Sequence, residues 1–141
     1  VAMALKERNK DITIGLGDTM GASMYEYFKH GEPKASDGSS IAEGIGQGRI
    51  TGNVDGTPVD IPFQISDEEA LPYAFDLLEH EGLCVGGSSA INVAGAVRLA
   101  REPGHTIATV LCDLGTRYQS KLFNPDFLKE KGLPVPKWLD Q

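Results

Sequence analysis

The run Gly86-Gly87-Ser88-Ser89 has the residue types best suited to hold a ligand. Glycines let the backbone turn tightly and come close to a bound group, and serine hydroxyls are neutral hydrogen-bonding groups. An apolar stretch of strand type precedes the run and a helical pattern follows it, so the serines fall where the first N–H groups of a helix are unpaired. The run is a candidate binding site, and an ordinary helix N-cap accounts for its local sequence equally well.

A second candidate, Asp113-Leu114-Gly115-Thr116-Arg117-Tyr118, follows residues 106–112, the most strand-like run of the chain. That run is apolar on both faces, which is typical of a central strand in a parallel sheet. Ligands bind beyond the carboxyl ends of parallel strands, and both candidates follow strand-like runs. We therefore expect the two candidates to meet at one edge of the sheet.

Glycines also recur at Gly44, Gly46 and Gly48. Their conformational freedom lets neighbouring N–H and C=O groups face a bound molecule. The spacing differs from the G-x-G-x-x-G dinucleotide fingerprint, and no clear strand precedes it. Taken alone, the segment is more typical of a mobile loop than of a phosphate site.

The hydrophobic pattern predicts the elements that position these segments. Strand-like runs at 12–18, 58–65, 83–85 and 106–112 alternate with helical patterns. The clearest helix is expected to begin after Ser66, with Glu69 completing a capping box, and to stop at Gly82. A second helix is expected to follow Ser89, and a short one Asn124-Pro125. The alternation predicts an α/β fold with an open, mainly parallel sheet flanked by helices.

Composition narrows the classes of function. The 141 residues carry a formal net charge of −7 with a pI near 4.9, which argues against nucleic-acid binding. Cys84 and Cys112 are expected to be buried free thiols, and the three histidines, expected on the surface, fit no metal motif. No run is long enough to span a membrane and none resembles a signal peptide, so we expect a cytoplasmic protein.

Four ordered blocks carry a family resemblance over nearly the whole chain, namely residues 38–46, 66–70, 81–89 and 113–118. They resemble the carboxyl-terminal half of cysteine synthase (O-acetylserine sulfhydrylase), a family of fold type II pyridoxal-phosphate enzymes. The resemblance implies that residues 1–141 are the carboxyl-terminal part of a larger two-domain chain whose cofactor is pyridoxal 5'-phosphate. The chain also opens within an apolar-faced helical pattern, which adds to the expectation of a fragment.

The resemblance implies a role for several residues. The Ser88 hydroxyl matches the partner of the cofactor's pyridine nitrogen, and a neutral partner there favours β-elimination and replacement over transamination. The other implied positions are cofactor-binding Gly87 and Gly44, the substrate loop of Gly44, Ile45 and Gly46, and a supporting corner formed by Asp113 and Tyr118.

The implied reaction is the replacement of the acetate of O-acetyl-L-serine by sulfide to give L-cysteine. The Schiff-base lysine, the substrate-carboxylate loop and the phosphate loop of the family match positions upstream of this sequence, and Lys6, Lys10 and Lys121 lie in other contexts. We therefore expect no catalytic residue within this chain and no activity from it alone. The resemblance further implies a homodimer that associates with serine acetyltransferase.

Two alternatives stay open. Cystathionine β-synthase and related lyases share the serine turn, although the block of residues 43–46 favours the sulfhydrylases. Cys112, Leu114 and the pair Ala90-Ile91 depart from common family residues, which leaves the cofactor assignment in place and weakens the choice of subtype. The other alternative is a non-catalytic α/β binding module.

Overall fold

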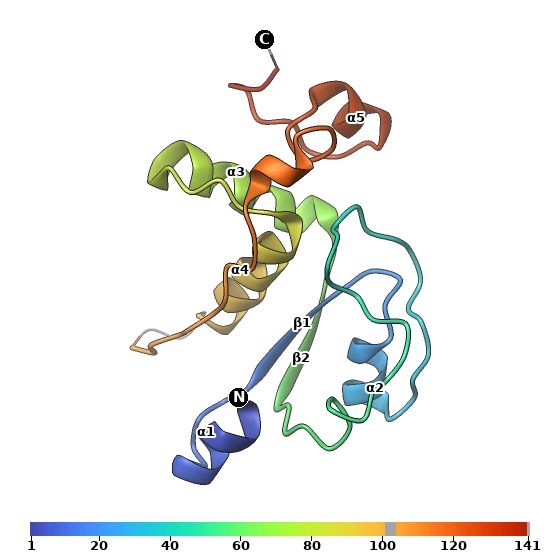
Figure 1. The fold of residues 1–141 in the computed structure, drawn as a ribbon, viewed down its shortest axis with the longest axis vertical. Coiled ribbons are helices and arrows are strands. Elements are labelled where there is room, and N and C mark those ends of the chain that lie inside the picture. Colours follow the sequence, from blue (N-terminus) through green and yellow to red (C-terminus); the bar gives the residue numbers. More distant parts are fainter. Residues whose placement is uncertain (101–103, 141) are drawn as a thin grey trace.

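The computed structural model describes residues 1–100 and 104–140. Its elements are α1 (Ala2–Arg8), β1 (Gly15–Thr19), α2 (Met24–His30), β2 (Ile61–Ile65), α3 (Asp67–Glu81), α4 (Gly87–Leu99), the 3-10 turn η1 (Gly115–Tyr118) and α5 (Pro125–Glu130). β1 and β2 pair in parallel, with Gly15 opposite Ile61 (Figure 1). The expected α/β fold with a parallel sheet flanked by helices is confirmed, and the sheet has two strands within the described residues.

The two faces of the sheet bind different helices (Figure 1). A Cβ on Gly17 would lie 3.5 Å from Ile91 of α4, and a Cβ on Gly15 would come within 2.7 Å of Leu99. On the opposite face Asp18 accepts a hydrogen bond from the backbone N–H of Tyr25 in α2, at 2.9 Å. Because side chains alternate along a strand, the glycines of β1 let α4 pack directly on the backbone while Asp18 holds α2.

Helix α3 begins and ends where the sequence predicts. The Ser66 hydroxyl accepts the backbone N–H of Glu69 at 3.4 Å, and Gly82 closes the helix in the left-handed conformation at φ 69°. The expected capping box is only half formed, because the Glu69 carboxylate binds Arg98 of α4, with Nε–Oε1 at 2.7 Å. This ion pair joins α3 to α4 instead of satisfying the first turn of α3.

Two apolar clusters hold the fold together. One lies between the sheet, α3 and α4, and it comprises Ile65, Ala70, Ala74, Val85, Ala90, Ile91 and Ala94. The other joins α3 to the carboxyl-terminal segment, and it comprises Leu71, Phe75, Tyr118, Leu122 and Leu128. Trp138 packs edge-on against Phe75 with ring centroids 6.2 Å apart, so it anchors the tail.

The prediction of a central strand at 106–112 is wrong. The segment runs beside α4 and is mostly exposed, with Val110 67% and Leu111 43% exposed (Figure 1). Within the described residues its neighbourhood has one isolated antiparallel bridge, between Val85 and Leu114, which also replaces the strand expected at 83–85. A strand needs a neighbouring backbone to pair with, and this segment is instead held by side chains of α4.

The prediction of two buried thiols is also wrong, because Cys84 is half-buried and Cys112 lies exposed on this unpaired segment. His30, His80 and His105 are exposed, as expected. In the described part of the chain no helix has the length and apolar character needed to cross a membrane. No group of potential metal ligands occurs among those residues.

Candidate functional site

The direction of α4 brings its amino terminus to the carboxyl edge of the sheet. Leu99, at the end of α4, lies over Gly15 at the start of β1, while Ile91 lies over Gly17. The helix therefore runs antiparallel to β1, and Gly87 lies toward the end at which β1 finishes. The sequence predicted a ligand site at this edge, where α/β sheets bind ligands.

The turn before α4 and the segment ending at Asp113 are joined by backbone hydrogen bonds. The N–H of Gly86 donates to the carbonyl of Asp113 at 3.1 Å, and the N–H of Gly115 donates to the carbonyl of Cys84 at 3.0 Å. The hydroxyl of Ser89 accepts the backbone N–H of Cys112 at 2.9 Å. These contacts confirm that the two candidate segments meet.

Asp113 and Tyr118 form a packed pair beneath this turn. The Tyr118 hydroxyl donates to Asp113 Oδ2, and the tyrosine is only 7% exposed. Hydrogen bonding to the Asp113 carboxylate raises the pKa of the Tyr118 phenol above its ordinary value. Asp113 Oδ1 is buried and has no hydrogen-bond partner among the described residues. This oxygen faces Gly86, where even a Cβ would find no room.

Residues 40–48, called the glycine loop below, lie against the same turn. A Cβ on Gly87 would lie 3.1 Å from the Ala42 Cβ, and a Cβ on Gly46 would lie 2.7 Å from Thr19 Oγ1 at the end of β1. Gly44 and Gly46 both have left-handed backbones, with φ values of 76° and 83°. The structure therefore brings the loop, the turn and the end of β1 together.

Ser88 lies in the first turn of α4 at the centre of this arrangement. The residue is 3% exposed, and no hydrogen bond of its hydroxyl is found within the described residues, but its oxygen is not one of the fully buried polar atoms that lack a partner. Ser88 therefore offers an unpaired neutral group, whereas the hydroxyl of Ser89 is used by Cys112.

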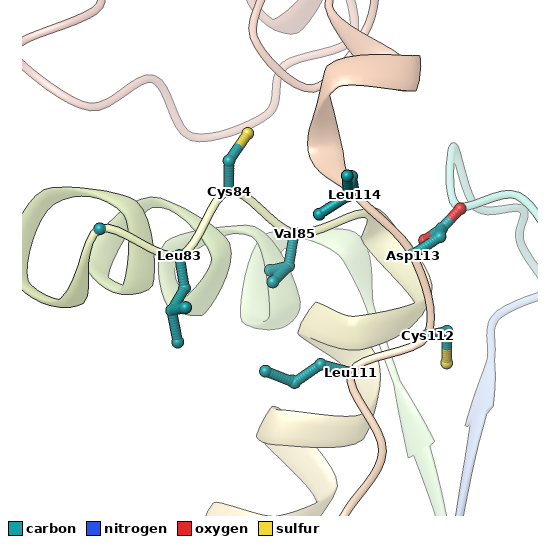
Figure 2. Close-up of a pocket in the computed structure, with 8 residues that line it drawn as sticks. Leu83, Cys84, Val85, Leu111, Cys112, Asp113 and Leu114 are labelled. Carbon is teal, nitrogen blue, oxygen red and sulfur yellow. The ribbon is translucent and has the colours of Figure 1, made fainter.

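Two hollows flank the turn. One of about 300 Å³ lies at the carboxyl edge, between the end of β1 and the loop, and it is lined by Thr19, Met20, Gly21, Ala22, Gly38, Ser39, Ser40, Ala42, Ile45 and Gly46. The other, of about 450 Å³, is mainly apolar and runs between residues 82–85 and 111–114. Figure 2 shows that the Cys84 and Cys112 side chains around this second hollow point away from each other.

Several contacts at this edge were missed by sequence reasoning. Asp67 binds Ser40 and Ile41 at the start of the loop, and Lys121 forms an ion pair with Glu43. The sequence predicts that Asp67 follows the Ser66 cap of a helix, and it carries no local signal for a contact with a residue 27 positions away.

Comparison with known proteins identifies the family. A profile described as pyridoxal-phosphate-dependent enzyme matches residues 1–113. The chain belongs to this family of pyridoxal-phosphate-dependent enzymes. Cysteine synthase 2 of Schizosaccharomyces pombe is 37% identical over 99% of the chain, and cysteine synthase 1 of Neurospora crassa is 42% identical over 89% of it. The chain spans 40% and 35% of the lengths of these two relatives.

A solved relative in this pyridoxal-phosphate family has the same fold. The O-acetylserine-dependent cystathionine β-synthase of Helicobacter pylori superposes with a TM-score of 0.73 at 31% identity. The match covers 85% of this chain and 37% of that one.

The residues at the carboxyl edge fit one side of the cofactor of this family. Ser88 provides an unpaired, neutral hydroxyl in a nearly closed position. A pyridine nitrogen needs one polar partner there, and a hydroxyl can either donate to it or accept from it. The adjoining loop presents backbone groups at Gly44 and Gly46. These residues would hold the cofactor from the side of Ser88.

Proposed function

We propose that residues 1–141 are the carboxyl-terminal part of a cysteine synthase, which replaces the acetate of O-acetyl-L-serine by sulfide to give L-cysteine. The observation that carries the proposal is the unpaired Ser88 hydroxyl in the turn that adjoins the glycine loop. Cysteine synthases 37% and 42% identical to the chain support the choice of reaction.

In this proposal each segment has a separate task. Pyridoxal phosphate, when bound, supplies an electron sink for the substrate's α-carbon. Ser88 holds the pyridine nitrogen as a neutral partner, with Gly87 and Gly44 as the neighbouring cofactor-binding residues. Gly44, Ile45 and Gly46 line the substrate side and exclude water, and Asp113 and Tyr118 fix the turn from below.

The proposal is tested with the intact protein and a Ser88→Ala variant. A net hydrogen bond of about 1 kcal/mol corresponds to roughly fivefold in affinity, so Ser88→Ala should weaken cofactor binding about fivefold and shift the cofactor's absorbance band. Ser120→Ala is the matched control, because Ser120 is exposed and only its backbone carbonyl accepts a side-chain hydrogen bond, from Asn124. An unchanged affinity and band in Ser88→Ala would remove Ser88 from the site.

A cystathionine β-synthase is the second candidate, because the solved relative carries that name and is O-acetylserine-dependent. The two reactions differ in the sulfur nucleophile and share O-acetyl-L-serine as the other substrate. Supplying the intact protein with O-acetyl-L-serine and either sulfide or homocysteine separates them by product. A preference for homocysteine would favour this second candidate.

The proposal includes the assembly and the location of the intact protein. We expect a cytoplasmic homodimer that associates with serine acetyltransferase, and a relative in Saccharomyces cerevisiae described as putative mitochondrial makes the compartment worth testing. The 141 residues alone are expected to make no cysteine, since the lysine that binds the cofactor is expected upstream. Borohydride reduction with the cofactor followed by mass spectrometry checks this, and a labelled lysine in the chain would contradict it.

A further inference from the structure

Asp67 lies at the first position of α3 and contacts the start of the glycine loop. It is 8% exposed, and both of its carboxylate oxygens are directed to residues of the loop. Oδ1 accepts the hydroxyl of Ser40 at 2.6 Å, and Oδ2 accepts the backbone N–H of Ile41 at 2.7 Å. Hydrogen bonds to a buried carboxylate belong to the strong class.

The α3 cap does not depend on this carboxylate. Ser66 is the N-cap and accepts the N–H of Glu69. An acidic residue in the first turn also gains from the helix dipole. That gain would not require Asp67 to bind both Ser40 and Ile41.

The contacts of Asp67 continue as far as the turn that holds Ser88. The Ser40 hydroxyl, fixed by Asp67, also accepts the N–H of Ala42 at 3.0 Å. Ala42 lies against Gly87, whose Cβ position is 3.1 Å from the Ala42 Cβ. Each step is a direct contact, so a continuous series of contacts joins the carboxylate of Asp67 to the α4 turn.

We infer that Asp67 is a positioning residue, which holds residues 40–42 so that the glycine loop closes one wall of the cofactor and substrate site. This inference rests on the proposed function. Asp67 reaches the site through Ser40, Ile41 and Ala42, and its two hydrogen bonds fix the start of the loop.

Asp67→Ala in the intact enzyme removes both contacts. Deuterium exchange of a peptide spanning residues 40–46 should become at least tenfold faster. The KM for O-acetyl-L-serine should rise about fivefold with kcat changed less than twofold, because a displaced wall weakens ground-state and transition-state binding alike. Asp76→Ala is the matched control, since Asp76 is an exposed acid of the same helix.

Asp67→Asn provides the rescue. Its amide oxygen accepts the Ile41 N–H, and its amide nitrogen donates to the Ser40 hydroxyl, so exchange and KM should stay within twofold of the original protein. Ser40→Ala removes one contact of Asp67 and one of Ala42, so its effect on exchange and KM should be intermediate. This variant tests the inference if Asp67→Ala fails to fold.

A purely structural role predicts a different pattern. Asp67→Ala would then lower the midpoint of thermal unfolding while KM and loop exchange at 25 °C stayed unchanged, and that result would overturn the inference. An Asp67→Asn variant as impaired as Asp67→Ala would also overturn it. Deuterium exchange is measured without substrate, so it tests the contact of Asp67 with the loop whether or not the protein makes cysteine. An intact protein that makes no cysteine would refute the proposed function alone.

Discussion

Gly86→Ala perturbs the turn at one well-defined point. Gly86 has φ −79°, which any residue adopts, so the substitution tests space alone. The added Cβ would collide first with Asp113 Oδ1, and would lie 2.7 Å from Tyr118 Cε2 and 3.2 Å from Asp113 Cγ. Real Cβ atoms essentially never lie under 3.0 Å from such atoms, so the surroundings must move.

Neither neighbour of Gly86 can move freely. The Asp113 carboxylate is short and is bound at Oδ2 by the Tyr118 hydroxyl, and the Tyr118 ring is 7% exposed. Overpacking of this kind costs about 1–3 kcal/mol of unfolding free energy. We expect the upper part of that range, about 2–3 kcal/mol, because two constrained groups are displaced together.

Urea denaturation followed by circular dichroism measures this cost, and cofactor titration measures the displacement of Ser88. Gly52→Ala is the matched control, because a Cβ there would meet no atom within 4 Å. Gly52→Ala should change the unfolding free energy by less than about 0.5 kcal/mol. If Gly86→Ala were as stable as Gly52→Ala and bound cofactor normally, the packing of the turn against Asp113 would be refuted.

Two further substitutions test the carboxyl edge. Gly46→Ala should lower the free energy of unfolding by about 1–3 kcal/mol more than Gly44→Ala, as measured by urea denaturation. Both glycines have left-handed backbones, but only a Cβ at residue 46 would meet Thr19. Equal losses of stability in the two variants would contradict this. Burial raises the pKa of Asp18 above its ordinary value, so the folded protein favours the protonated carboxyl group. The stability that this group contributes is fully present at pH values below the unfolded pKa, and it is lost as the pH rises through the folded pKa. Asp18→Asn should therefore gain stability relative to the original protein between pH 3 and pH 7, measured by urea denaturation, and a gap independent of pH would refute the burial cost.

Elements with local end signals were predicted well. Ser66 and Gly82 delimit α3, and Asn124 begins α5, where its side chain accepts the N–H groups of Asp126 and Phe127. These signals act within a few residues, so the sequence contains both partners. Glu69 shows where such reasoning ends, because its carboxylate binds Arg98, a residue 29 positions away.

The strand expected at 106–112 failed for a different reason. β-branched and apolar residues favour a strand when they can pack on a buried pleated surface, and that packing depends on neighbouring strands. In the described structure Asn92 holds this segment by donating to the carbonyl of Val110 at 2.9 Å. The pattern therefore predicted both the burial and the strand pairing of this segment wrongly.

Residues 86–89 and 113–118 meet as predicted, although the strands from which that prediction was made do not form in the described structure. The cause lies in β1, where Gly15 and Gly17 leave one face of the strand bare and α4 packs on it directly. Alternate glycines in a strand indicate such a close approach, so this signal was present in the sequence. Because α4 runs back along β1, its amino terminus and Ser88 reach the carboxyl edge. The loop contacts of Asp67 had no such cause in the backbone, which is why they could be found only in the structure.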